Sequence, residues 1–501
     1  MRQIIPLGVR CACVLVLAML GSVAAAQSMA PVGMFENHQD VGEVLHAGAS
    51  EFDAGAKSYT LSGSGDNMWA AKDAFQFAWK KASGDLTLTA DISFVGKGTD
   101  PHRKACLLIR QSLDADSPYV DVALHGSGLT SLQWRESKGA ATHEVESNLE
   151  MPRRLRIEKR GKYVRMWLAM EGQELSFSGA AERIEFQEPF YVGIGVCAHN
   201  KDLVEKAIFA NVELNTALPP ATGTPQLYST LETQTVSSTD RRVTMVFNTR
   251  IEAPNWLKDG TTLIYNSGGR IYKIPAAGGK PEAIDTGFAI RCNNDHNISP
   301  DGKMLAISDQ TQGRSRVYTV PLAGGTPKLI TPTATSYFHG WSPDGKTLAY
   351  AGQRPDDFEI YTIPADGSAP ETRLTNSPGT DDGPEYSSDG KYIYFNSVRT
   401  GLMQIWRMKP DGSEQEQVTN DQFNNWFAHP SPNNQRIVFI SFNKDVVGHP
   451  ENKDISIRIM TLATKQIDVL GNMFGGQGTA NVPNWSPDGR KIAFVTYQLI
   501  N

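Results

Sequence analysis

The sequence has few cysteines, no long apolar run and no excess of basic residues. Only 5 of its 501 residues are cysteine, and no apolar run reaches the about 20 residues that a membrane-spanning helix needs. Its 48 Lys and Arg residues are outnumbered by 54 Asp and Glu residues, so the basic surface typical of nucleic-acid-binding proteins is missing. The sequence therefore predicts no transmembrane segment and no nucleic-acid partner.

Patterns of long helices are scarce as well, whereas turn-forming residues are frequent. The chain contains 45 glycines and 28 prolines, and its 40% hydrophobic and 20% charged residues are ordinary for a globular protein. A chain of this length has room for about two to four domains. This composition predicts an all-β, turn-rich protein.

The first 26 residues have the features of an export signal. Arg2 and Arg10 precede the apolar run 11–20, and the small residues up to Ala26 form a cleavage pattern. We therefore expect a signal peptide over residues 1–26 and a mature protein that is periplasmic or secreted.

Three cysteines remain after such a cleavage. Cys106 and Cys197 lie inside apolar, strand-like patterns, and Cys292 lies in a polar segment. We expect buried thiols, and a disulfide between Cys106 and Cys197 is the alternative that an oxidising compartment would permit.

The second half of the chain repeats one turn motif. Trp341-Ser-Pro-Asp-Gly345 has five further, partly degraded copies, and the second residues of the six motifs are 257, 299, 342, 387, 431 and 486. Spacings of 42, 43, 45, 44 and 55 residues are near the period of propeller blades, and a short β-rich run follows each turn. The repeats predict a six-bladed β-propeller over 231–501. We expect two strands within 227–248 to pair with the C-terminal strand and close the ring.

The first half has no such period. Ten alternating apolar runs occur within 32–215, which predicts a two-sheet β-sandwich. Its tryptophans are expected in the core, with sugar stacking as the alternative: Trp69, Trp79, Trp134 and Trp167. A Pro-, Thr- and Gly-rich segment over 216–230 is the predicted linker.

These motifs resemble two known families. The Ser-Pro-Asp-Gly turn followed by an apolar strand resembles the TolB-type propeller repeat, over about 231–501. The sandwich is similar to concanavalin A-like jelly-roll modules on the motifs Gly63–Trp69, Leu107–Gln111 and Tyr191–Gly195. Together the resemblances imply an all-β protein, a concanavalin A-like β-sandwich followed by a six-bladed TolB-like β-propeller. The chain has no Gly-x-Ser-x-Gly elbow, so a serine peptidase of the propeller-bearing kind is excluded.

The segments that lead into the innermost strands of a propeller converge at its axial mouth, and here they carry unusual residues. His296, His339, Glu385 and His429 stand just before the turns of blades two to five. We predict His296, His339 and His429 as ligands of one divalent ion (Mn, Zn or Ca), with Glu385 or Asp382 as a base. The secreted oligogalacturonate lyases, propellers with a His-rich metal centre on the axis, are the analogy. The alternative is that these residues hydrogen-bond the loops and line a watery channel.

Other mouth residues are predicted to contact a ligand. We expect Arg291 and Arg354 to meet an anionic sugar, and Tyr337 and Trp426 either to stack on a sugar ring or to pack on a neighbouring blade. Polar contacts are expected from Asn294, Asp295, Asn425 and Asn481. The longest spacing contains His449–Asp454 and Phe474–Thr479, which either connect blades or overhang the site.

Three functions remain open. The first is an exported, monomeric protein that binds a saccharide or an envelope protein at the propeller mouth, with the sandwich as a lectin-like accessory domain. The second is a metal-assisted lyase or hydrolase of acidic oligosaccharides. The third is a protein scaffold of the cell envelope, as the TolB resemblance implies.

Overall fold

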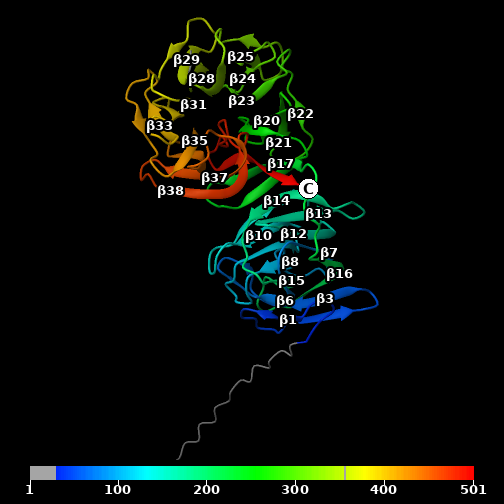
Figure 1. The fold of residues 1–501 in the computed structure, drawn as a ribbon. Helices are drawn as coiled ribbons and strands as arrows, with labels where there is room; N and C mark the ends of the chain where they lie inside the picture. The colour runs from blue at the N-terminus through cyan, green and yellow to red at the C-terminus, as the bar shows by residue number, and fades with distance from the viewer. Residues whose placement is uncertain (1–29, 355–356) are drawn as a thin grey trace, which may run out of the picture.

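The computed structural model describes residues 30–354 and 357–501, and Figure 1 shows a sandwich joined to a propeller. All regular secondary structure within these ranges is strand, so the prediction of an all-β protein is confirmed. Since the described residues form no helix, they contain none of a length and hydropathy suited to crossing a membrane. The predicted signal peptide, 1–26, lies outside the described residues.

The N-terminal half consists of two sheets that face each other across one core. The first is part of a ten-stranded sheet in the order β1 (Asn37–Val41), β6 (Phe75–Ala82), β15 (Phe190–Cys197), β8 (Lys104–Arg110), β9 (Tyr119–His125), β10 (Thr130–Arg135), β11 (His143–Glu146), β18 (Arg241–Phe247), β17 (Gln226–Thr235) and β39 (Lys491–Ile500). The second has seven strands: β14 (Ser176–Arg183), β13 (Tyr163–Ala169), β12 (Arg154–Arg160), β7 (Leu86–Phe94), β16 (Glu205–Asn215), β3 (Ser58–Gly63) and β2 (Ala49–Asp53). A two-stranded hairpin, β4 (Met68–Trp69) and β5 (Lys72–Asp73), accompanies them.

Strand alternation explains why these sequences form a sandwich. Leu107 and Ile109 of β8 and Val122 of β9 pack against Leu88 of β7 and Ile157 of β12 in one buried cluster. Residues at alternate positions point to opposite faces. In β12 the intervening residues are polar and only partly buried, whereas in β8 Cys106 and Leu108 pack in a second buried cluster. All ten runs predicted from the sequence contain strands, and β1, β2, β4, β5, β11 and β14 are additional.

The C-terminal half contains five separate four-stranded sheets, here called blades one to five. Their strands, from the innermost outwards, are β19 (Glu252–Trp256), β20 (Thr262–Ser267), β21 (Arg270–Pro275) and β22 (Glu282–Ala283); β23 (Cys292–Ile298), β24 (Met304–Asp309), β25 (Arg316–Pro321) and β26 (Lys328–Leu329); β27 (Ser336–Trp341), β28 (Thr347–Gln353), β29 (Phe358–Pro364) and β30 (Thr372–Arg373); β31 (Asp381–Tyr386), β32 (Ile393–Ser397), β33 (Gln404–Met408) and β34 (Glu416–Gln417); and β35 (Phe423–Pro430), β36 (Arg436–Asn443), β37 (Glu451–Thr461) and β38 (Ile467–Gly476). The chain is therefore a β-propeller in its second half.

The repeated turn explains how β-strands follow one another at a fixed spacing. In the turn after β27, the Ser342 hydroxyl donates to Asp344 at 2.6 Å and accepts from the backbone amide of Thr347 at 2.9 Å. Gly345 has a φ of 72°, which a residue with a side chain rarely adopts. The motif thus closes a tight turn and starts the second strand of the blade.

The predicted pairing of two strands within 227–248 with the C-terminal strand is observed, directly for the first of them. β17 pairs antiparallel with β39 from Gln226↔Ile500 to Thr235↔Lys491, and β18 pairs with β17 on its other side. Because β17 begins at Gln226, the last five residues of the predicted linker, 226–230, belong to this strand.

The cysteine prediction is also confirmed. Cys106, Cys197 and Cys292 are all buried and unpaired with one another. Burial raises the pKa of the Cys197 thiol to about 11, so this thiol is protonated at neutral pH.

The sandwich and the propeller share one sheet and a buried ion pair. β11 pairs with β18 in parallel, and the Arg241 guanidinium of β18 lies 3.0 Å from the Glu182 carboxylate of β14 and 3.5 Å from that of Glu232 on β17. All three side chains are buried, and burial raises the pKa of Glu182 to about 7 although Arg241 opposes the shift. Arg241 is therefore the cation that keeps two buried carboxylates compatible with the fold.

Replacing that cation tests the junction. We expect Arg241→Met to lower the free energy of unfolding by about 3–5 kcal/mol, because it leaves buried carboxylates without a counter-charge. A carboxyl whose pKa is raised in the folded state costs stability as pH rises, so the loss is larger at pH 8 than at pH 5.5. Urea unfolding at both pH values measures it, with the exposed neighbour Arg242→Met as the control. Equal unfolding of the two variants would contradict the role of Arg241.

Candidate functional site

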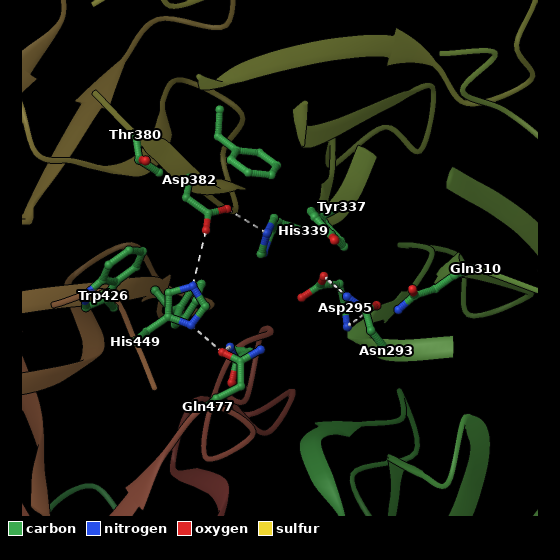
Figure 2. A pocket seen from close by; sticks show the side chains of 14 residues that line it. Asn293, Asp295, Gln310, Tyr337, His339, Thr380, Asp382, Trp426, His449 and Gln477 are labelled. Carbon is green, nitrogen blue, oxygen red and sulfur yellow. Dashed lines mark hydrogen bonds and ion pairs between the residues drawn. The ribbon is translucent and has the colours of Figure 1, made fainter. Parts of the chain in front are cut away.

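A cavity of about 490 Å³ opens at the end of the propeller axis where the innermost strands begin. Residues of β23, β27, β29, β31 and β35, of the segments after β24, before β31 and before β37, and of the segment after β38 line it: Asn293, Asp295, Gln310, Tyr337, His339, Phe358, Thr380, Asp382, Trp426, Phe427, Gly448, His449, Gln477 and Asn481. Figure 2 shows their polar groups converging on one space. We call it the axial cavity.

Irregular pairing in the innermost strands determines which side chains face the axial cavity. The register shifts between Cys292 and His296 in β23, between Phe338 and Gly340 in β27, and between Trp426 and His429 in β35. An extra residue in one strand turns nearby side chains away from the strict alternation. Asp295, His339 and Phe427 stand inside these irregular stretches and line the cavity.

Asp382 is the centre of the polar network in the cavity. One carboxylate oxygen lies 3.2 Å from Nε2 of His339, and the other lies 3.8 Å from Nε2 of His449 (Figure 2). Burial alone would raise the pKa of Asp382, but the hydrogen bond and charge of His339 hold it below its usual value. The backbone amide of Gly383 also donates to Asp382, at 2.7 Å. Asp382 is therefore an ionised acceptor at neutral pH.

The second carboxyl of the cavity behaves in the opposite way. Asp295 is 5% exposed and accepts from the Asn293 amide at 2.5 Å. Burial raises the pKa of Asp295 to about 6, with His339 opposing the shift and Asp382 adding to it. Burial disfavours the charged form of His339, but Asp295, Asp382 and Glu385 together raise its pKa. One ionised carboxylate, one carboxyl that titrates near neutrality and one readily protonated imidazole thus share the space.

Aromatic rings form the walls of the cavity. The Phe427 and His339 rings are stacked with centroids 5.9 Å apart, and the His449 ring contacts Trp426 edge-on at 4.4 Å. Tyr337 and Phe358 lie close on the opposite side, with centroids 5.8 Å apart. Flat apolar faces therefore stand next to hydrogen-bonding groups, an arrangement typical of sites for small polar ligands.

The structure divides the ligand-binding residues predicted from sequence into two groups. Asp295, Tyr337, Trp426 and Asn481 line the axial cavity, as do His339 and Asp382. Arg291, Asn294 and Asn425 are not among its lining residues.

The residues outside the cavity have other roles. Arg291 is exposed, and its backbone amide donates to Asp309 at 2.8 Å. The Asn425 amide donates to Gln404 of the neighbouring blade four at 3.1 Å and to Asp421 at 3.0 Å. Arg354 is bound by the Glu371 carboxylate at 3.0 Å. The anionic-sugar contacts expected from the two arginines are therefore not provided in this cavity.

The predicted three-histidine metal centre does not form. His429 uses both ring nitrogens, Nδ1 with the Glu385 carboxylate at 2.6 Å and Nε2 with the Ala480 carbonyl at 3.0 Å, whereas His296 is fully buried with neither nitrogen bonded. No group of three or more His, Cys, Asp or Glu residues within 30–354 and 357–501 is arranged to hold a metal ion. The donor sets therefore do not fit the metal that the lyase analogy implies.

Glu385 also departs from its predicted position. It lines a different cavity of about 460 Å³, together with Trp256, Trp341, Tyr386 and Trp485, the residues that end the innermost segments. Asp382 and Glu385 are three residues apart on β31, with a register shift between them, and they line different cavities. Of the two residues predicted as the base, Asp382 therefore lines the axial cavity and Glu385 does not.

Three important residues of the cavity escaped the sequence analysis as site residues. His449 and Gln477 hydrogen-bond each other, and the Asn481 amide donates to Gln477 at 3.1 Å. Both come from the insertion that gives the longest repeat spacing, and of the two alternatives stated for this insertion, connecting blades or overhanging the site, the lining favours the second. Phe427 follows Trp426 with a φ of 55°, a conformation that no sequence pattern indicated.

Comparison with known proteins agrees with the propeller part of this architecture. A family model described as the TolB beta propeller domain matches residues 336–449. An uncharacterized protein of Agrobacterium fabrum, Atu1656, is 47% identical over 261 residues, which is 51% of this chain and 89% of that protein. A solved structure from Agrobacterium tumefaciens with a provisional TolB name is also 47% identical, with a TM-score of 0.53, and the match covers 56% of this chain and all of that one.

An oligogalacturonate lyase solved with manganese is a more distant match. It is 14% identical with a TM-score of 0.36, covering 54% of this chain and 78% of the lyase. A likeness of this size gives no support for a shared activity.

The raised pKa of Asp295 yields a test of the cavity's electrostatics. The pKa of this carboxyl is about 6 in the folded state and about 4 in the unfolded state. Its ionisation therefore lowers the free energy of unfolding by the full amount above pH 6 and leaves it unchanged below pH 4. We therefore expect Asp295→Asn to raise the free energy of unfolding by about 2–3 kcal/mol at pH 7.5, with the gain vanishing at pH 4. Urea unfolding measures both, and the exposed Glu174→Gln provides the same charge change. A gain that is equal at both pH values would contradict the assignment.

Proposed function

The chain belongs to the TolB-like β-propeller family of the Agrobacterium relative, and from this premise we propose that it is an exported binding protein whose axial cavity holds a neutral saccharide. The observation that carries the proposal is the pairing of aromatic walls with hydrogen-bond acceptors in one cavity. Saccharides present apolar ring faces and hydroxyl donors together, which this combination matches.

The charges of the cavity favour a neutral over an acidic sugar. None of the described lining residues is Lys or Arg, whereas Asp295 and Asp382 are both present. A uronate would meet these carboxylates without an arginine to pair with it. The imidazole of His339 does not replace such an arginine, because it is already paired with Asp382 at 3.2 Å.

The finer architecture follows the same premise. We infer that β39, β17 and β18, with the segment 479–485, make a sixth blade. Two backbone hydrogen bonds support it, from Ala493 to Asn484 at 2.9 Å and from Val495 to Thr479 at 3.0 Å.

We also infer that residues 32–215 are a concanavalin A-like jelly-roll and act as a lectin-like accessory domain. Export of a monomer to the periplasm or medium, after cleavage at Ala26, completes the proposal.

A second candidate is a glycoside-cleaving enzyme that uses the two carboxyls of the cavity. Asp295 has a raised pKa and Asp382 a lowered one, and two carboxyls with opposed shifts are suited to acid and base roles. Cleavage would appear as new reducing ends after incubation with the saccharide that the parent binds. Asp295→Asn would then abolish cleavage while binding persists.

The binding proposal is tested by titrating neutral and uronic-acid-containing oligosaccharides into the mature protein. We expect neutral oligosaccharides to bind and Asp382→Asn and Trp426→Ala each to weaken this binding about 10-fold or more, because they remove an ionised acceptor and an aromatic wall. Calorimetry measures the affinities. Arg291→Ala is the matched control, since this exposed side chain is not among the lining residues.

Three results would contradict the proposal. One is exclusive binding of uronic-acid oligosaccharides, which would require a cation that the described lining lacks. Another is binding that survives both cavity substitutions unchanged. The third is capture of an envelope protein through the axial cavity with no saccharide bound, which would favour the scaffold function.

A further inference from the structure

A second cavity, of about 350 Å³, lies in the sandwich on the face of the ten-stranded sheet that points away from the core. Lys104, His125, Gln133 and Glu144 line it from β8, β9, β10 and β11. The strand register brings them together: Lys104 pairs with His125, and Gln133 pairs with Glu144. We call it the sandwich cavity.

We propose that the sandwich cavity is a separate binding site for a neutral or amino sugar. The inference rests on the proposed role of the sandwich as a lectin-like domain, and it assigns the residues and the ligand chemistry of that role. Its support comes from hydrogen-bonding capacity that the protein leaves unused.

Gln133 supplies the first unused group. Its side chain is 1% exposed, and its amide nitrogen donates to the Ser131 hydroxyl at 3.1 Å and to the Glu144 carboxylate at 3.3 Å. Its amide oxygen is buried and has no partner. A buried acceptor without a partner is costly, and a hydroxyl or amine donor of a ligand would satisfy it.

His125 adds a second acceptor. Its Nδ1 lies 3.2 Å from the Leu129 carbonyl, which can only accept, so Nδ1 carries the proton and Nε2 is left as an acceptor. Burial lowers the pKa of His125 to about 3, in keeping with a neutral ring. Among the described residues, the Gln133 amide is the only donor in contact with Nε2. Its distance of 3.5 Å is long for a hydrogen bond.

The one lysine of the cavity is already engaged. The Lys104 ammonium donates to the Asn67 side chain at 3.0 Å and to the Met68 carbonyl at 2.7 Å, and it lies 5.4 Å from the centre of the Trp69 ring. It therefore holds the β4–β5 hairpin in place, and with it the aromatic wall that Trp69 contributes. Trp69 is only partly buried, unlike Trp79 and Trp134 in the packed clusters.

Carboxylates dominate the remaining charge. Glu144 and Glu146 both line the cavity and are partly exposed. Free acceptors, two carboxylates and an aromatic wall select a ligand with several donors, an apolar ring face and no negative charge. Neutral and amino sugars meet these requirements, whereas uronic acids do not.

An oligosaccharide array tests the inference on the mature full chain. It carries neutral, amino-sugar and uronic-acid oligosaccharides, and it is probed with Glu146→Gln and Trp69→Ala in a background that has the Trp426→Ala change in the axial cavity. We expect the background protein to bind neutral or amino sugars and both sandwich substitutions to reduce this binding about 10-fold. Glu150→Gln, an exposed carboxylate outside the lining, is the matched control.

The two proposed sites fail separately in this design. If Trp426→Ala alone abolishes all saccharide binding, the sandwich inference is overturned and the axial proposal stands. If binding is lost only on the sandwich substitutions in an otherwise unchanged chain, the axial proposal is overturned. Binding confined to uronic acids overturns the sandwich inference. Glu146→Gln preserves side-chain shape, so it remains informative if Trp69→Ala fails to fold.

Discussion

The rest of the molecule depends on one antiparallel ladder, the pairing of β17 with β39 from Gln226↔Ile500 to Thr235↔Lys491. This ladder joins the start of the propeller half to its C-terminal strand, so the edges that β17 and β39 turn to each other are paired. β18 continues the same sheet into the sandwich, where it pairs in parallel with β11. The Arg165 side chain of β13 also bonds Gln498 on β39 at 2.9 Å, so the last strand is held from both halves. Convergence of the inner strands, and hence the axial cavity, follows from this closure.

Closing the ring creates a polar mouth that is expensive to maintain. Asp295 and His339 are each 5% exposed, and His296 is completely buried without a hydrogen bond. Buried groups of this kind reduce stability unless something else repays the cost. The apolar clusters between the blades, such as that around Leu348 and Tyr350, stabilise the fold and offset the unfavourable burial of these polar groups. A concentration of such groups at one end of the axis is the pattern expected of a ligand site.

The sequence predicted the strands well because the chemistry of the turns between them is local, whereas the pairing of β17 with β39 joins segments far apart in the chain and was predicted from the repeat pattern. A tight turn of this kind uses Gly at positive φ and a Ser that bonds both the Asp and the next strand, so four of the six copies keep all three residues, whereas the copies at 257 and 431 are degraded. The site was predicted only in part, because side-chain direction depends on irregular strand pairing that the sequence does not reveal. His296 and His339 share one repeat position, yet His296 pairs in register with Ile307 while His339 stands within the shift between Phe338 and Gly340. Only His339 lines the axial cavity. His449 and Gln477 belong to an insertion outside the repeat, where no period could indicate their position.

The two cavities, in different folds, share one chemical bias. In the axial cavity the ionised Asp382 and the buried Asp295 accept, and the nearby arginines that could have reversed the charge are held elsewhere, Arg354 by Glu371. In the sandwich cavity Lys104 is committed to the β4–β5 hairpin, and Gln133 keeps an unpaired oxygen. Near each site, the cations are thus bound by other groups of the protein, and hydrogen-bond acceptors beside an aromatic ring face the cavity. A ligand able to satisfy either site must bring hydroxyl or amine donors on an apolar frame.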